Sequence, residues 1–109
     1  MPSIAPSGEG SLLLTGTFQT VFQATINKTY EGKIDLSAMQ AGDTVEIQGH
    51  ERIESGGAWI KYTKTITYND AVDDPLVGFQ PRGNPYGYRI QARQTAGTFR
   101  TIKYLFMEF

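Results

Sequence analysis

The chain contains no cysteine and a single histidine, His50, and these two shortages exclude many kinds of site. Without cysteine there are no disulfides, no thiol nucleophile and no cysteine-ligated zinc or iron–sulfur centre. With one histidine there is no HExxH or HxH metal motif and no convincing Ser-His-Asp triad. No apolar run approaches about 18 residues, so we expect no membrane-spanning helix. The opening MPSIAPSGEGS also lacks the basic and apolar regions of a secretory signal.

The chain also has no marked excess of positive or negative charge. Ten Lys and Arg face eleven Asp and Glu, which gives a formal net charge of −1 over 109 residues. This balance provides no basic footprint for nucleic acid, so we expect no nucleic-acid partner. What the sequence does have is threonine, aromatic residues and twelve glycines. This composition fits pleated strands joined by turns, and the length suits one domain, so the sequence predicts an all-β protein.

Apolar and polar residues alternate with a period of two in several runs, which predicts β-strands. In the run 60–68, for example, Ile60 and Ile66 share the face that we expect to point inward. SGG at 55–57 and TAGT at 95–98 predict hairpin turns, because such turns need positive φ angles. About seven or eight short antiparallel strands predict a single, jelly-roll-like β-sandwich over residues 12–109.

Two segments interrupt the alternation. Residues 1–11 are rich in Pro, Gly and Ser and predict a flexible N-terminal arm. DLSAMQAGD, residues 35–43, starts with cap residues and ends with a Gly-Asp turn. It predicts one short helical corner near residues 36–40, with Leu36 and Met39 pointing into the core. We interpret this corner as the place where the chain passes from one sheet to the other.

Few residues suggest chemistry. Asp70, Asp73 and Asp74 are weak candidates for binding a cation such as Ca²⁺, but they lack the regular DxDxDG spacing and a distal Glu. A solvated loop is the better interpretation. His50 has the outward parity of its strand, so we expect a surface histidine rather than a catalytic base. No carboxylate pair and no nucleophile with a base can be named, so we predict no enzyme, no catalytic residue and no cofactor.

The final run, FRTIKYLFMEF, is apolar on both faces toward its end, which predicts surface that contacts other proteins. Trp59 has outward parity beside the SGG turn, and an extended arm can add to a neighbouring sheet. The residues that we predict to form an interface are Ile4, Pro6, Trp59, Leu105, Met107 and Phe109.

Four segments carry a resemblance to a known group of proteins. They are NKTYEGKIDLSAMQAGDTVEI (27–47), ERIESGGAWIKYTKTITY (51–68), DDPLVGF (73–79) and RIQARQTAGTFRTIKYLFMEF (89–109). In order, they resemble a strand, corner and strand, a central hairpin with a Gly-rich tip, a connecting segment and a final hairpin of small virion proteins from tailed bacteriophages. Tyr104 stands where the group's pattern leads us to expect Trp. The resemblance covers most of the chain after Leu12.

The resemblance implies a phage structural protein that decorates or cements the exterior of the capsid shell, with the major capsid protein as its partner. Such a protein is expected to be a homo-oligomer, a trimer or dimer, because many weakly bound copies at symmetric sites give high avidity. The alternative is a β-sandwich module of the tail or neck that binds a receptor or glycan. In that case Trp59 and the tyrosines would stack on sugar rings.

Overall fold

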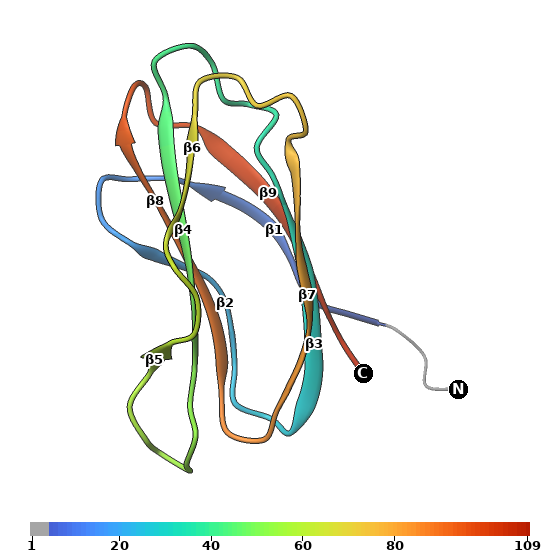
Figure 1. Ribbon diagram of the computed structural model, residues 1–109. Helices are drawn as coiled ribbons and strands as arrows, with labels where there is room; N and C mark the ends of the chain where they lie inside the picture. The colour runs from blue at the N-terminus through green and yellow to red at the C-terminus, as the bar shows by residue number, and fades with distance from the viewer. Residues whose placement is uncertain (1–4) are drawn as a thin grey trace.

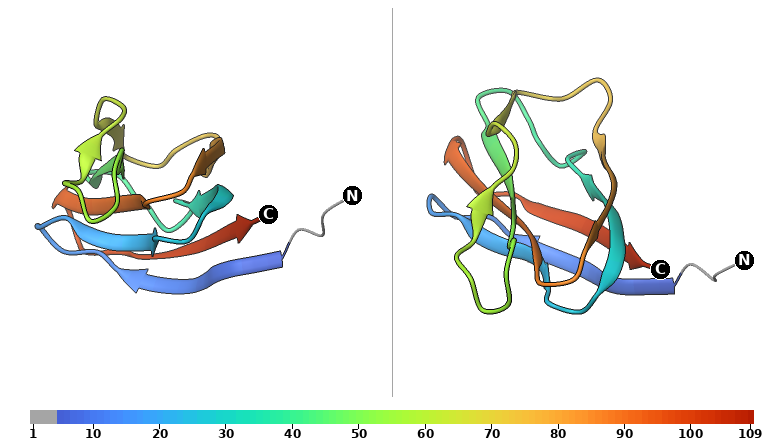
Figure 2. Two further views of the ribbon diagram at one scale, coloured as in Figure 1. Left: turned by 90° about the horizontal axis from the view of Figure 1, so that it is seen from below. Right: turned by 60° about the horizontal axis from the view of Figure 1, so that its bottom comes forward.

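The computed structural model describes residues 5–109, with side chains from residue 8 onward, and this part of the chain contains nine β-strands and no helix. The strands are β1 (Ala5–Leu13), β2 (Gln19–Ala24), β3 (Lys28–Asp35), β4 (Thr44–Glu51), β5 (Ile60–Lys61), β6 (Ile66–Asn69), β7 (Leu76–Asn84), β8 (Tyr88–Ala96) and β9 (Thr101–Glu108). They pack as two antiparallel sheets (Figures 1 and 2), so the predicted all-β sandwich is confirmed. No helix that could span a membrane occurs in the described residues.

The two sheets have the strand orders β1-β9-β3-β7 and β2-β8-β4-β5, with β6 also pairing with β4. The antiparallel pairs are nested along the chain: β1 pairs with β9, β2 with β8, β3 with β7, and β4 with β5 and β6. A long ribbon folded back on itself and then rolled up gives this pattern, which is that of a jelly roll. The pairs β3–β9 and β4–β8 then join the turns of the roll into sheets.

Stacked aromatic rings join the two sheets through the core. Phe22 of β2 stacks on Phe106 of β9 at a centroid distance of 4.7 Å, and Tyr30 of β3 stacks on Tyr88 of β8 at 5.3 Å. Each pair contributes one ring from each sheet, and all four side chains are buried. Such pairs add about 0.5–1.5 kcal/mol each beyond the burial of apolar area. The aromatic residues therefore fix how the sheets lie on one another.

The N-terminal segment corrects the expected domain boundary. The sequence predicts a flexible arm over residues 1–11, but Ala5–Leu13 is an edge strand that pairs with β9 along its length. Gly8 helps to explain why a glycine-rich segment is ordered here: a Cβ at this position would lie 2.9 Å from the Phe22 ring. Glycine brings the backbone of β1 close to the aromatic core, where a larger residue does not fit. The prediction is therefore wrong from the fifth residue onward.

The corner near residues 36–40 is a turn rather than a short helix. The backbone N–H of Met39 donates to the carbonyl of Leu36 at 3.0 Å and closes the turn. Both side chains are buried, as the sequence predicts, with exposed fractions of 0% for Leu36 and 1% for Met39. A second turn follows, in which Gly42 has a φ of +89°. This angle lies outside the right-handed helical region, so the two turns do not merge into a helix.

Two irregularities in the strands have simple causes. Val21 interrupts the alternation of β2, and a register shift at this residue allows both Val21 and Phe22 to be buried. Pro81 lies within β7, where a register shift leaves it without a partner in β3. Because β7 is also at the edge of its sheet, the missing N–H of proline costs no ladder hydrogen bond.

Replacing Gly32 with alanine should destabilise the sandwich, because the new Cβ would lie 2.1 Å from Cδ1 of the buried Phe106 ring. We expect Gly32→Ala to lower the free energy of unfolding by about 1–3 kcal/mol, the usual cost of overpacking. The matched control is Gly78→Ala on the neighbouring strand, where a Cβ would meet nothing within 4 Å. Urea unfolding followed by circular dichroism compares the two variants, and equal losses would contradict the packing argument.

Candidate functional site

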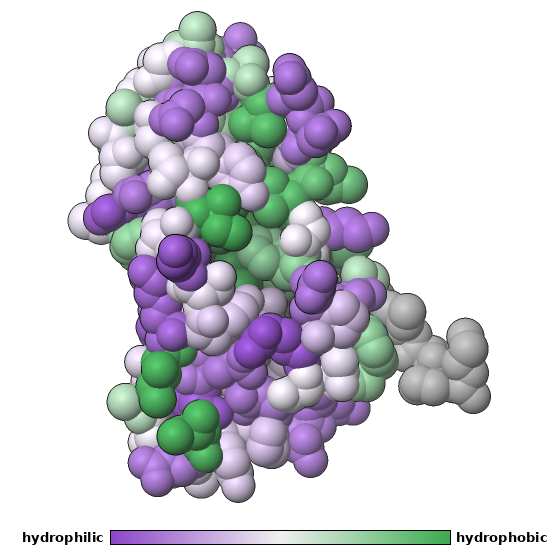
Figure 3. Space-filling view, in the orientation of Figure 1, coloured by the Kyte–Doolittle hydropathy of each residue, from purple (hydrophilic) through white to green (hydrophobic). Residues whose placement is uncertain are grey.

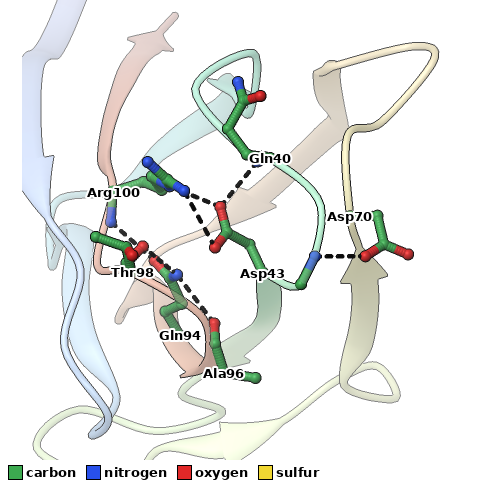
Figure 4. A network of polar contacts seen from close by, with 8 residues as sticks. Gln40, Asp43, Asp70, Gln94, Ala96, Thr98 and Arg100 are labelled. Atoms are coloured by element: carbon green, nitrogen blue, oxygen red, sulfur yellow. Dashed lines mark hydrogen bonds and ion pairs between the residues drawn. The ribbon is translucent and has the colours of Figure 1, made fainter.

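Two of the four segments that carry the resemblance, 27–47 with DLSAMQAGD and 89–109 with QTAGT, meet in a network of polar contacts (Figure 4). Asp43, the last residue of DLSAMQAGD, is 1% exposed. Its carboxylate accepts hydrogen bonds from Nε of Arg100 at 2.6 Å and from the backbone N–H of Gln40 at 2.8 Å. Arg100 follows the QTAGT turn (94–98), which joins β8 of one sheet to β9 of the other, so the predicted hairpin at this turn is wrong. A single ion pair thus connects the corner before β4 to the turn before β9.

Gln94 completes this polar cluster from within β8. Its side chain is fully buried and donates to the carbonyl oxygens of Ala96 at 3.0 Å and Thr98 at 2.6 Å. Its side-chain oxygen accepts from the backbone N–H of Arg100 at 2.9 Å. The amide therefore satisfies backbone groups that the tight turn leaves without partners, which is a structural role.

The chemistry of the cluster also favours a structural role. Hydrogen bonds from Arg100 and from the backbone of Gln40 hold the pKa of the Asp43 carboxyl below its ordinary value. A carboxylate whose pKa is lowered and which already accepts several hydrogen bonds is a poor general base. Asp43 and Arg100 therefore hold the two turns together. This geometry agrees with the interpretation of DLSAMQAGD as a structural corner.

The three aspartates proposed as cation ligands do not converge. The Asp70 carboxylate accepts from the backbone N–H of Gly42 at 2.7 Å, and thus braces the corner (Figure 4). Asp73 and Asp74 are exposed in the following loop. Within residues 5–109, no group of three or more His, Cys, Asp and Glu side chains is placed to hold a metal ion.

His50 lies on the outer face of its sheet, but it is only 8% exposed, so the expectation of a surface histidine is wrong. It stands opposite Arg89 of β8 and Lys61 of β5, whose side chains flank it. The Nε of Arg89 donates to Nδ1 of His50 at 3.4 Å. Burial, followed by the positive charges of Arg89 and Lys61, lowers the pKa of His50. Neighbours on two other strands cause this burial, and the parity of one strand cannot reveal them.

Trp59 is half-buried, and its ring is not free to stack on a ligand. The guanidinium carbon of Arg52 lies 4.3 Å from the ring centroid, and that of Arg89 lies 4.7 Å from it. Gly87 provides room for the indole, since a Cβ there would lie 2.7 Å from Cη2 of the ring. The sugar-stacking role considered for Trp59 therefore does not fit this geometry.

A groove of about 360 Å³ opens on the side of the sandwich where β6 and β7 face each other. Apolar surface gathers along it in Figure 3. At one end the Arg82 guanidinium lies 4.0 Å from the Tyr62 ring and pairs with Glu51. Ile66, expected to point inward, is 41% exposed beside the groove, because the sheets do not close over it. The residues that line the groove include Ile47, Gln48, Tyr62, Ile66, Phe79 and Arg82.

The outer face of the β1-β9-β3-β7 sheet carries part of the predicted interface. Leu105 and Met107 lie on this face, as the sequence predicts, and both are half-buried. In the register of the sheet, Leu105 stands between Glu9 and Lys33, and Met107 stands opposite Glu31. The face therefore has an apolar centre within a charged surround. Its role as an interface stays a prediction.

The other predicted interface residues lie in different places. Phe109 follows β9 and is half-buried, with two backbone hydrogen bonds to Thr29 at 2.9 and 3.0 Å. Pro6 pairs in register with Met107 at the edge of the same sheet. Ile4 lies outside the described residues. The structure thus brings Pro6 and Met107 together and places Trp59 directly before β5 of the other sheet.

No protein-family model, no curated protein and no solved structure matches this chain. The strand order and the contacts of the corner define the class of this protein. It is a jelly-roll β-sandwich whose corner motifs hold the turns together. The surfaces left for binding are the two outer faces and the groove.

Asp43→Asn should lower the denaturant midpoint at neutral pH. The folded pKa of Asp43 lies below its ordinary value of 3.8, so the ionised carboxylate stabilises the fold above that pH. This contribution is lost as the pH falls through the lower, folded pKa, so the difference between wild type and variant should narrow below about pH 4. Chemical unfolding of the wild type and the variant, from neutral pH to below about pH 4, measures this difference in the denaturant midpoint.

The control for this variant is Glu46→Gln, which removes a partly exposed pair with Arg93 at 2.7 Å. It should shift the midpoint much less, because exposed pairs are weak. A midpoint for Asp43→Asn that equals that of the control would show that the corner does not depend on the buried pair.

Proposed function

We propose that this protein is a non-enzymatic structural protein of a phage virion, a decoration or cement protein on the exterior of the capsid that binds the major capsid protein. The resemblance of four segments supports this assignment. Two of those segments also pack together through the Asp43–Arg100 pair, so the resemblance extends to one connected part of the structure. The observation that carries the proposal is the outer face with Leu105 and Met107 beside an edge strand.

This face has the composition of an interaction surface. An apolar centre with a charged surround is the usual anatomy of a protein–protein interface. Among the described residues, β1 pairs only with β9, so its other edge presents backbone groups that can extend a partner's sheet. On this proposal, Leu105 and Met107 line the contact between copies in a trimer or dimer, and β1 docks on the major capsid protein. Weak contacts repeated over a symmetric shell then give high avidity.

The double variant Leu105→Glu/Met107→Glu should prevent self-association and reduce shell occupancy, because burying carboxylates in an apolar contact is costly. Sedimentation measures the oligomer, and quantitative mass spectrometry of purified particles measures occupancy against the major capsid protein. The control is Ile53→Glu, a position that is 77% exposed outside this face and should tolerate the same charge. Full occupancy by the double variant, with its fold verified by circular dichroism, would contradict the role of the face.

The copy number of the wild-type protein tests the assignment itself. On the order of hundreds of copies that scale with the capsid protein would support a decoration or cement role. About three to twelve copies would place the protein at the tail or neck, where symmetry limits the number of sites. Absence from purified particles would contradict a virion role.

The second candidate is a tail or neck module that binds a receptor or glycan. The groove between β6 and β7 favours it, because Tyr62, Phe79 and the guanidinium group of Arg82 combine apolar and hydrogen-bonding surface in one concave site. A glycan array with the purified protein separates the two candidates.

A further inference from the structure

The arginines of this chain fall into two groups. Three of them form ion pairs with a carboxylate: Arg82 with Glu51, Arg93 with Glu46 and Arg100 with Asp43. Within residues 5–109, Arg52 and Arg89 form no ion pair, and both lie against the indole ring of Trp59. The two guanidinium groups without an anionic partner are thus gathered at one place.

Stacking on a ring does not replace an anion elsewhere in the protein. The Arg93 guanidinium lies 4.3 Å from the Phe18 ring and still pairs with Glu46. Arg82 lies 4.0 Å from the Tyr62 ring and still pairs with a carboxylate. The arrangement around Trp59 repeats this pattern with two guanidinium groups but without the carboxylate.

Two other basic side chains, His50 and Lys61, lie at the same place. His50 of β4 lies opposite both Arg89 of β8 and Lys61 of β5. Burial and then the charge of Arg52 lower the pKa of Arg89, and burial followed by the charges of Arg89 and Lys61 lowers that of His50. Arg52 and Arg89 therefore repel each other, and Arg89 and Lys61 disfavour a positive charge on His50. The Nε–H of Arg52 is also buried without an acceptor in the described residues.

We propose that Arg52, Arg89, His50 and Lys61 around Trp59, the Trp59 cluster, form an oxyanion-binding site that takes the carboxylate of an acidic side chain on a partner protein. A planar guanidinium group binds a carboxylate with two parallel hydrogen bonds. Each of the other arginines already takes a carboxylate of this chain, which favours a carboxylate over a phosphate. That the partner is the capsid protein rests on the proposed function, whereas the site itself does not.

The protein contains its own probes, since Trp59 is the only tryptophan and His50 the only histidine. Purified protein is titrated with a tetraglutamate peptide, with inorganic phosphate and with sodium chloride at equal ionic strength. Indole emission and the NMR signal of the His50 ring are followed. The peptide should give a saturable change in emission and raise the pKa of His50, because a negative charge offsets those of Arg89 and Lys61. Chloride should do neither.

Arg52→Gln and Arg89→Gln should each weaken peptide binding by about tenfold. Arg93→Gln is the matched control: it removes one positive charge from the same sheet, but from an arginine that already has a partner. The control should retain its affinity. In the wild type, the NMR signals of the Nε–H groups of Arg52 and Arg89 should also shift on titration with the peptide. This measurement does not depend on whether the variants fold.

Two results would overturn the proposal: no saturable response to the peptide, or an equal loss of binding in Arg93→Gln. A saturable response to phosphate but not to the peptide would likewise overturn the carboxylate proposal, and it would assign the site to a phosphate-type ligand. Because these titrations use the isolated protein, their failure is distinct from failure of the virion assignment. Peptide binding by a protein absent from particles would retain the site and overturn only the virion role.

Discussion

The ion pair between Asp43 and Arg100 is the interaction on which the other parts of the fold depend. It connects residues 57 positions apart and joins the start of β4 to the start of β9, one strand from each sheet. Burying the Asp43 carboxylate beside a partly exposed arginine is costly, and the surrounding hydrogen bonds offset this cost by satisfying the carboxylate and the turn. Gly97 leaves room for the pair, since a Cβ there would lie 2.0 Å from the Asp43 carboxylate. A residue with a side chain at position 97 would push the Asp43 carboxylate away from Arg100.

The inner faces of the two sheets pack together in the aromatic core. The two sheets therefore differ chiefly in the side chains on their outer faces. One outer face is centred on Leu105 and Met107 and suits a dry contact. The other carries polar pairs across β4 and β8, such as the side-chain hydrogen bond between Gln48 and Gln91 at 3.1 Å. It ends at the Trp59 cluster. A single rigid sandwich thus offers two surfaces of different chemistry, and a protein that bridges two neighbours needs this property.

The sequence predicts what depends on local alternation and misses what depends on distant neighbours. Period-two patterning is enough to predict the sandwich and the outward face of Leu105, and the cap and turn residues of the corner predict its buried side chains. It does not predict β1, because the glycines there are favoured by rings that belong to other strands. Nor does it predict the burial of His50, which long side chains on β5 and β8 produce. The sequence likewise does not predict which carboxylate pairs with which arginine, because the fold brings these residues together from distant positions.

The nested pairing has a consequence for how the chain is made. β1 pairs with Thr101–Glu108, and β2 and β3 also pair with strands from the second half of the chain. Only the innermost pairs, β4 with β5 and β6, join strands that follow one another closely. On the ribosome, the first three strands therefore emerge long before their partners, and the roll closes from its centre outward. Folding is completed only after the last strand is released, which makes assembly slow and leaves early strand edges open to misassociation.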